Sequence, residues 1–343
     1  MKLRQSVKLD YFLALTDHIA VLQHAKFSVP ARRYGYTVDD NARALVFVVK
    51  ARPYWSSQPL LELERKLLSF LLLMQAENGK FHNLMDFSQR IIDDPFVGDH
   101  LGRAVWATGA VINSDLPDGI KASARHIFDQ AIPWARESTS PRTRAYACLG
   151  ACERLHADEN DPNLRNIVAS LADSLTELYN SNEGTEWRWF ENILSYDNAR
   201  LPQALFSAYR CMGDRKHLQV AETTFRFLQS ETTIDEKFVP IGNQGWYMRG
   251  EKRALYDQQP VEAGTMVETA ALAYKITRTE AYEKAVRQAL SWFYGFNMKS
   301  VKVYDEETGA CHDGITEAGL NENHGSEATI SMLLAVATFL ECL

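Results

Sequence analysis

The sequence predicts an all-α protein built as an (α/α)6 barrel, in which six outer helices surround six inner ones. Three observations lead to this prediction. Apolar residues recur at helical spacing through almost the whole chain. Amphipathic segments alternate with segments that are apolar on all sides, and a helix of the second kind is buried. The buried segments also open alike, with polar or capping residues followed by small ones.

The amphipathic segments are the expected outer helices. The stretch LELERKLLSFLLL is a clear example, because Lys, Arg and Glu alternate with leucines at helical spacing. Six such segments lie near residues 8–26, 59–76, 118–136, 163–180, 215–230 and 278–296.

The apolar segments are the expected inner helices. Their openings read TVDDNARALVFVV, VGDHLGRAVWATGAV, TSPRTRAYACLGAC, SYDNARLPQALFSAY, QPVEAGTMVETAALAY and NENHGSEATISMLLAV, and they begin near residues 37, 97, 139, 195, 259 and 321. Six helical hairpins fill the chain and leave no linker, so we expect one domain over residues 1–343. Inner helices of such a barrel run parallel, and their N-termini should therefore meet around one cavity.

Composition excludes several classes of function. The chain of 343 residues is 46% hydrophobic and 24% charged, with a net charge of −7 and no basic stripe, so nucleic acid is not an expected partner. No apolar run approaches the length of a membrane span, and no membrane partner or targeting segment is expected. Five cysteines without a disulfide framework favour a cytoplasmic location. The absence of HExxH, paired CxxC and calcium-loop patterns predicts no metal and no cofactor.

Acids stand at the starts of the expected inner helices, and aromatic residues stand in the loops that enter them. The aromatic loop residues are Tyr34, Tyr36, Phe81, Phe87, Phe96, Trp187, Trp189, Phe190, Tyr196, Trp246 and Tyr247. Flat rings stack on the apolar faces of pyranoses, and carboxylates accept hydrogen bonds from their hydroxyls. Two carboxyls can also supply the acid and the base of glycoside hydrolysis. Two long loops, about 232–260 and 304–327, are expected to form walls of the site.

We therefore predict a carbohydrate site with two groups of residues. The predicted catalytic acids are Asp40, Glu262 and Glu327. The predicted substrate-binding residues are Tyr36, Asp99, Trp189, Glu191, Asp197, Trp246, Glu322 and His324. Arginines near the helix starts are expected to brace acids rather than to catalyse.

The two adjacent acids of YGYTVDDNARAL are expected to differ in role. Asp39 has Arg43 four residues further on, a spacing at which a helical ion pair can form. Asp40 has Ala44 at that spacing. Neighbouring residues of a helix point about 100° apart, so both acids cannot face one ligand in the same way. The sequence predicts that Asp39 is structural and that Asp40 faces the cavity.

Four motifs carry a resemblance to known proteins. The stretches YGYTVDDNARAL, WRWFENILSYDNARLPQAL, QPVEAGTMVETA and CHDGITEAGLNENHGSEATISMLLA resemble bacterial proteins described as glycosyltransferase-associated or glycosidase-like. The architecture resembles the six-hairpin glycosidase superfamily. The resemblance implies the barrel fold, a carbohydrate context and a functional association with a glycosyltransferase; it assigns no reaction.

Three functions remain open from the sequence. The first is a glycoside hydrolase that acts on an oligosaccharide or glycan with two carboxylates. The second is a sugar epimerase or isomerase that uses histidines, for which His82, His100, His312 and His324 are in suitable loops. The third is a non-catalytic glycan-binding accessory to a glycosyltransferase.

Overall fold

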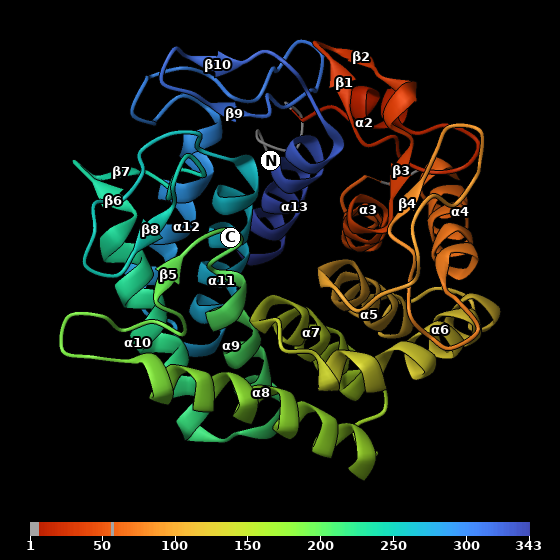
Figure 1. Cartoon of the computed structure of the whole chain (residues 1–343), viewed down its shortest axis with the longest axis horizontal. Helices are drawn as coiled ribbons and strands as arrows, with labels where there is room; N and C mark the ends of the chain where they lie inside the picture. The colour runs from red at the N-terminus through yellow and green to blue at the C-terminus, as the bar shows by residue number, and fades with distance from the viewer. Residues whose placement is uncertain (1–6, 56–57) are drawn as a thin grey trace.

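Two rings of helices form the structure, a computed structural model that describes residues 7–55 and 58–343 (Figure 1). The inner helices are α3 (Val38–Ala51), α5 (Asp99–Ile112), α7 (Pro141–Ala157), α9 (Arg200–Met212), α11 (Pro260–Thr277) and α13 (Ser326–Cys342). The outer helices are α2 (Asp10–Leu15), α4 (Gln58–Met74), α6 (Asp118–Glu137), α8 (Pro162–Asn182), α10 (Arg215–Glu231) and α12 (Glu280–Phe293). Each inner helix packs on the next, and α13 packs on α3 to close the ring. The predicted (α/α)6 barrel is therefore confirmed.

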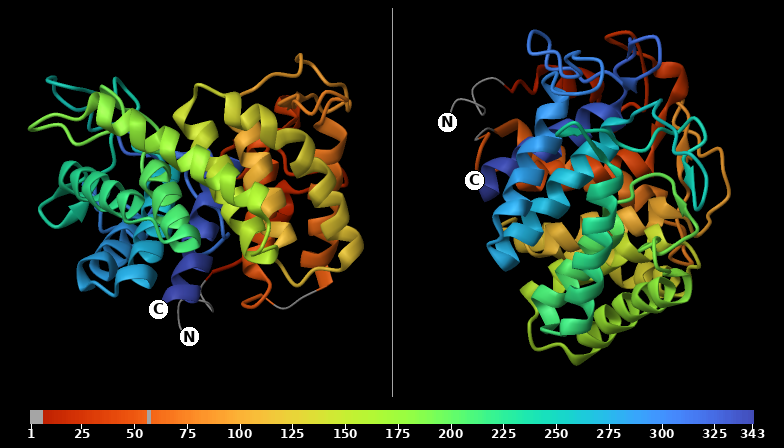
Figure 2. Two further views of the ribbon diagram at one scale, coloured as in Figure 1. Left: turned by 90° about the horizontal axis from the view of Figure 1, so that it is seen from below. Right: turned by 90° about the vertical axis from the view of Figure 1, so that its left-hand side faces the viewer.

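The inner helices begin where the sequence places them, and local chemistry explains several of these starts. The Thr37 hydroxyl accepts the backbone N–H of Asp40 at 3.1 Å and caps α3. The Ser140 hydroxyl caps α7, and proline occupies the first position of α7 and of α11. The long connecting loops lie at one end of the barrel, whereas α13 ends at the other (Figure 2).

One expected outer helix is much shorter than predicted. The segment near 8–26 forms a helix only as far as Leu15, whereas the other five expected outer helices end within three residues of their predicted limits. Asp17 explains the difference, because its Oδ1 accepts the N–H groups of Ile19 and Ala20 and holds a turn. The chain then continues into the hairpin of β1 (Ala25–Lys26) and β2 (Val29–Pro30).

Short antiparallel strands tie the loops together near the starts of the inner helices. Strand β3 (Tyr36–Thr37) pairs with β4 (Leu84–Met85), and β5 (Ile193–Leu194) pairs with β8 (Tyr247–Met248). Strand β6 (Thr233–Ile234) pairs with β7 (Lys237–Phe238), and β9 (Gly314–Ile315) pairs with β10 (Leu320–Asn321). The β3–β4 and β5–β8 pairs fix loops that are distant in sequence against one another, whereas β6–β7 and β9–β10 are local hairpins.

Helices α5 and α7 approach each other closely at two glycines. A Cβ atom on Gly109 would lie 2.2 Å from the carbonyl oxygen of Gly150, so no larger residue fits at that position. Within the described ranges, no helix combines the length and the apolar character needed to cross a membrane.

Candidate active site

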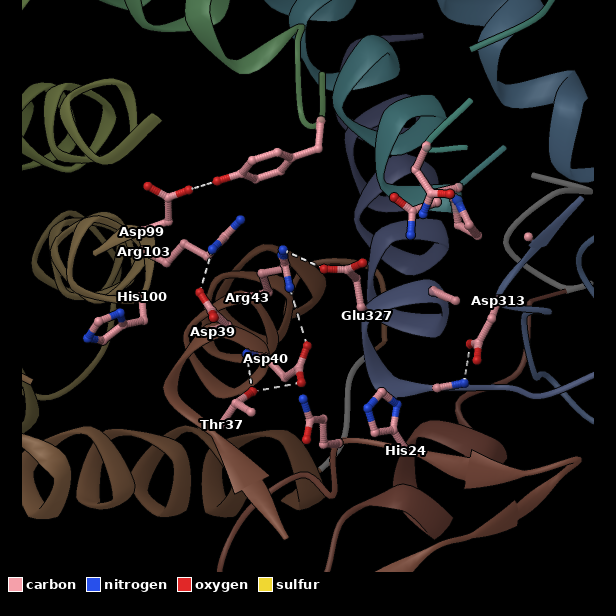
Figure 3. Close-up of a pocket in the computed structure, with 18 of the residues that line it drawn as sticks. His24, Thr37, Asp39, Asp40, Arg43, Asp99, His100, Arg103, Asp313 and Glu327 are labelled. Carbon is pink, nitrogen blue, oxygen red and sulfur yellow. Dashed lines mark hydrogen bonds and ion pairs between the residues drawn. The ribbon is translucent and has the colours of Figure 1, made fainter. Parts of the chain in front are cut away.

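A cavity of about 620 Å³ opens at the end of the barrel where the inner helices begin (Figure 3). The starts of α3, α5, α9, α11 and α13 contribute Asp39, Asp40, Arg43, Asp99, His100, Arg103, Tyr196, Pro260, Glu327 and Ala328. The start of α7 lies behind this lining, where the hydroxyls of Ser140 and Thr143 each donate to Asp99 at 2.8 Å. Five of the six inner starts thus converge on one cavity.

Both long loops form walls of the cavity, as predicted. The first contributes Asn243, Asp257 and Gln259, and the second contributes Asp313, Gly314, Thr316, Asn321 and Gly325. Gln23, His24, Asn83 and Phe96 complete the lining. Side-chain amides are frequent in this lining, and each of them can both donate and accept a hydrogen bond.

The cavity has an excess of negative charge. Its carboxyl groups belong to Asp39, Asp40, Asp99, Asp257, Asp313 and Glu327. Its guanidinium groups belong to Arg43 and Arg103, and both of these form ion pairs with lining acids. The arginines therefore brace acids, as the sequence predicted.

Asp39 is held as a charged carboxylate. It forms an ion pair with Arg103 of α5, and its Oδ2 accepts from the amide of Asn83 at 3.1 Å. Burial would raise the pKa of Asp39, but the guanidinium groups of Arg103 and Arg43 outweigh burial and keep this pKa below its ordinary value. Its side chain is 28% exposed.

Asp40 has the opposite electrostatic character. The Thr37 hydroxyl donates to its Oδ2 at 2.7 Å, and Arg43 lies 3.3 Å from its Oδ1. Burial raises the pKa of Asp40 to about 6, with a further contribution from the nearby charge of Glu327, although Arg43 opposes both. Only 6% of its side chain is exposed.

Arg43 joins Asp40 to Glu327. Its Nη2 lies 2.7 Å from Oε2 of Glu327, so one guanidinium contacts two acids of the site. The side chain of Glu327 is 43% exposed and extends toward Arg43 from α13 (Figure 3).

The predicted division of roles between the adjacent acids is wrong in one respect. Asp39 does not pair with Arg43 on its own helix but with Arg103 on the next one, and Arg43 pairs with Asp40 instead. Asp39 is consequently the more exposed of the two acids, although both line the cavity.

Glu262 lies outside the cavity lining, contrary to its prediction as a catalytic acid. Its carboxylate accepts the backbone N–H groups of Asp197 and Asn198 and the side-chain amide of Asn198. The positive φ of Asp197, 49°, aims these successive N–H groups at one anion. Burial raises the pKa of Glu262 to about 7, and the neighbouring charge of Asp197 adds to this effect. Glu262 supports the turn that carries Tyr196.

Asp197 and Glu191 also lie outside the lining. Asp197 is fully buried and accepts from the Thr265 hydroxyl at 2.6 Å, whereas Glu191 pairs with Arg142 at 2.8 Å. Both acids are engaged by partners within the protein, so their predicted contact with substrate is not supported by their positions.

The expected aromatic lining is wrong for three residues. Tyr36 and Trp189 are fully buried: Tyr36 donates to Asp17 at 2.6 Å, and Trp189 packs against Phe190. Trp246 is exposed but does not line the cavity. The rings that do line it are Phe96 and Tyr196, which belong to the same set of aromatic loop residues.

The remaining predicted residues divide between the cavity and its surroundings. Asp99 lines the cavity and accepts from the Tyr196 hydroxyl. Glu322 is exposed outside the lining. His324 is buried behind it, with its ring 4.2 Å from that of His312 between centroids.

Two histidines line the cavity. His100 is buried against Phe96, its Nε2 lies 3.1 Å from the carbonyl oxygen of Phe81, and burial lowers its pKa. His24 is exposed and was not predicted, nor was Asp313; both belong to loops whose folding depends on contacts distant in sequence. In the part of the chain that the structure describes, no group of three or more His, Cys, Asp or Glu side chains is arranged to hold a metal.

Comparisons with known proteins give matches only among solved structures. No model of a protein family and no curated protein matches the chain. A sugar epimerase from a ruminal bacterium superposes with a TM-score of 0.76 at 12% identity, over 98% of each chain. The cellobiose 2-epimerase from Bacillus thermoamylovorans gives 0.78 at 12% identity, over 99% of this chain and 97% of the other.

A third structure is an inactive variant of an α-1,6-mannanase from Salegentibacter sp., in complex with α-1,6-mannotetrose. Two consecutive aspartates are replaced by alanine in that variant. It superposes with a TM-score of 0.67 at 11% identity, over 99% of this chain and 97% of the other. These likenesses establish the fold alone: the chain is an (α/α)6 barrel, like those three structures.

Proposed function

We propose that the protein is a carbohydrate-active enzyme that cleaves a glycosidic bond of an oligosaccharide, with Asp39 and Asp40 as its two reacting carboxyls. The observation that carries this proposal is the opposite perturbation of the two acids. The pKa of Asp39 is lowered, whereas that of Asp40 is raised to about 6. Two carboxyls with separated pKa values in one cavity are the arrangement from which acid and base roles follow.

The roles follow from the protonation states. Asp40 keeps its proton in mildly acidic solution and donates it to the oxygen of the leaving sugar. Asp39 is ionised and acts on the anomeric carbon, directly or through a water molecule. The charge of Glu327 raises the pKa of Asp40, which helps to keep the proton there. The amide groups of the loop walls are suited to binding sugar hydroxyls.

The mannanase comparison supports the choice of acids. The inactive variant lacks two consecutive aspartates. This chain has two such pairs, Asp39–Asp40 and Asp93–Asp94, and only the first lines the cavity. Asp94 is exposed and provides a matched control.

Epimerisation or isomerisation of a sugar is the second candidate. It is favoured by the two lining histidines, His24 and His100, and by the higher TM-scores of the two epimerases. Against it, one ring nitrogen of His100 already faces the carbonyl oxygen of Phe81.

One experiment separates these candidates. The protein is incubated with α-1,6-mannotetraose, cellobiose and mannose, and the products are followed by NMR and mass spectrometry. Hydrolysis releases new reducing ends, and the first anomer formed distinguishes retention from inversion. Epimerisation or isomerisation changes the sugar without changing its mass. Turnover that is lost in Asp39→Asn and Asp40→Asn but kept in Asp94→Asn supports the proposal. Turnover that survives both cavity substitutions contradicts it.

Three further expectations remain predictions. The association with a glycosyltransferase rests on the motif resemblance, and a cytoplasmic location rests on cysteine usage. A single domain over residues 1–343 is supported by the packing of α13 on α3, which joins both ends of the described chain in one ring.

A further inference from the structure

A second cavity, of about 540 Å³, opens at the opposite end of the barrel, where the inner helices end. We call it the lower cavity. Every inner helix contributes to its rim near its last turn, through Lys50, Asn113, Glu153, His156, Arg210, Lys275, Thr338 and Glu341. The lower cavity shares no lining residue with the candidate active site.

The floor of the lower cavity is built from buried side chains that are mostly polar. Trp106, Gln203, Ser207 and Glu268 line it, and each of them is less than 10% exposed. Oε1 of Gln203 accepts from Nη1 of Arg200 at 2.6 Å, and the amide nitrogen of Gln203 has no hydrogen-bond partner within residues 7–55 and 58–343. This nitrogen is accessible from the cavity and is not sealed in the core, so a ligand in the cavity can accept hydrogen bonds from it.

The lining indicates the chemistry of the occupant. The charges of Lys50, Arg210 and Lys275 are balanced by the acids Glu153, Glu268 and Glu341, and His156 adds an imidazole to the lining. This balance gives no net attraction for an anion or a cation. An indole ring, an amide, a hydroxyl and a carboxylate around one space instead suit a molecule with an apolar face and several hydroxyl groups.

We propose that the lower cavity is a second binding site for a small neutral polyhydroxylated molecule, such as a monosaccharide. The floor groups bind its hydroxyls, and Trp106 packs against its apolar face. Binding at this site does not depend on the reaction proposed for the upper cavity.

Buried charges connect the two cavities. Asp39 pairs with Arg103, Arg103 lies 3.8 Å from Asp197, and Asp197 lies 3.7 Å from Arg200. Arg200 then pairs with Glu268 of the lower floor at 3.2 Å. Solvent screens such buried charges only weakly. This series of buried charges joins Glu268 of the lower floor to Asp39 of the upper site.

The test measures binding of D-mannose and D-glucose by saturation-transfer NMR and calorimetry. Asn243→Trp places a ring in the upper cavity, and Leu272→Trp places one in the lower cavity. Leu73→Trp is the control, because Leu73 is 57% exposed on the outer helix α4. Circular dichroism and thermal unfolding establish that each variant is folded.

We expect Asn243→Trp and Leu73→Trp to retain sugar binding at the lower site, whereas the variant that combines Asn243→Trp with Leu272→Trp binds none. Ser207→Ala, which removes one hydroxyl without adding volume, lowers the affinity of the Asn243→Trp protein about fivefold, the scale of one hydrogen bond. Loss of all sugar binding in folded Asn243→Trp overturns the proposal, as does binding that persists when both cavities are filled. Binding of inorganic phosphate or glycine betaine in place of the sugars overturns the assignment of a neutral polyhydroxylated ligand. If the proposed hydrolysis fails while these results hold, the lower site stands on its own.

Discussion

Replacing Asp40 with asparagine should stabilise the protein at neutral pH and strongly lower its turnover. The pKa of Asp40 rises from its ordinary value of 3.8 to about 6 in the folded protein. One pKa unit corresponds to about 1.4 kcal/mol, so the ionised carboxylate lowers the free energy of unfolding by about 3 kcal/mol above pH 6. Well below pH 3.8 the acid is protonated in both states, and this cost disappears. The folded protein therefore loses stability from this group as the pH rises from 4 to 6.

Asparagine removes the charge of Asp40, but it also removes one hydrogen-bond acceptor. Thr37 and Arg43 donate to different oxygens of the Asp40 carboxylate, and asparagine keeps only one of these two acceptors. The lost hydrogen bond offsets about 1 kcal/mol of the stability gained by removing the buried charge. Asp40→Asn should then be about 2 kcal/mol more stable than the native protein at pH 7.5 and about equal to it at pH 4.5.

Urea unfolding followed by circular dichroism at these two pH values measures the difference. Asp94→Asn should change stability by less than about 0.5 kcal/mol at either pH, since its side chain is exposed. Turnover of Asp40→Asn should fall about 10²–10⁴-fold if Asp40 is the general acid. An Asp40→Asn protein that is less stable than the native one at pH 7.5 would refute the reasoning, because it would mean that Arg43 holds Asp40 as a favourable charge.

Three other substitutions test the assignment of roles. Asp39→Asn should lower turnover, and it should also lower the free energy of unfolding by about 2 kcal/mol in urea at pH 7.5. The reason for the second effect is that buried Arg103 loses a charged partner that is itself partly exposed. Unchanged stability would contradict the ion pair. Glu262→Gln should raise the free energy of unfolding by about 1–2 kcal/mol at pH 7.5, because burial raises the pKa of Glu262 to about 7 and the accepting oxygen lost at the Asp197 turn offsets only part of the gain from removing the charge. Turnover of the folded protein should fall less than about tenfold. A far larger fall in the folded variant would restore Glu262 as a catalytic acid. Trp189→Ala should lower the free energy of unfolding by about 3–5 kcal/mol, because it leaves a cavity in the core. The sugar affinity of the folded fraction, measured by calorimetry, should not change. A selective loss of affinity would show that Trp189 contacts the ligand.

The helices were predictable because their signals are local. Apolar spacing and similar openings identified the six inner starts and five of the outer helices. The shortened α2 shows the limit of this reasoning, because the side chain of Asp17 offers nearby N–H groups an alternative to the helix. An apolar pattern continues past Asp17 in the sequence and does not reveal that competition.

The ion-pair partners of the acidic side chains were less predictable, because these partners lie on neighbouring helices. The spacing rule considers Asp39 and Arg43 on one helix, but Asp39 pairs with Arg103 on α5. Loop aromatics presented a similar difficulty. Trp189 belongs to a loop that packs into the hydrophobic core and contacts Phe227 of α10, so its ring is not available to line the cavity. The spacing of residues along the sequence predicts neither the Asp39–Arg103 ion pair nor the Trp189–Phe227 contact.

The closure of the ring by α13 on α3 determines when the site can exist during synthesis. Arg43 emerges from the ribosome well before Glu327, its partner across the cavity. Loop closure over such a separation is slow compared with the formation of helical hairpins. The hairpins can therefore form as they are made, but the cavity lacks one of its acids and part of its wall until the last helix docks. A growing chain can hold most of the barrel and still have no complete site, so activity should appear late and abruptly in a series of chains of increasing length.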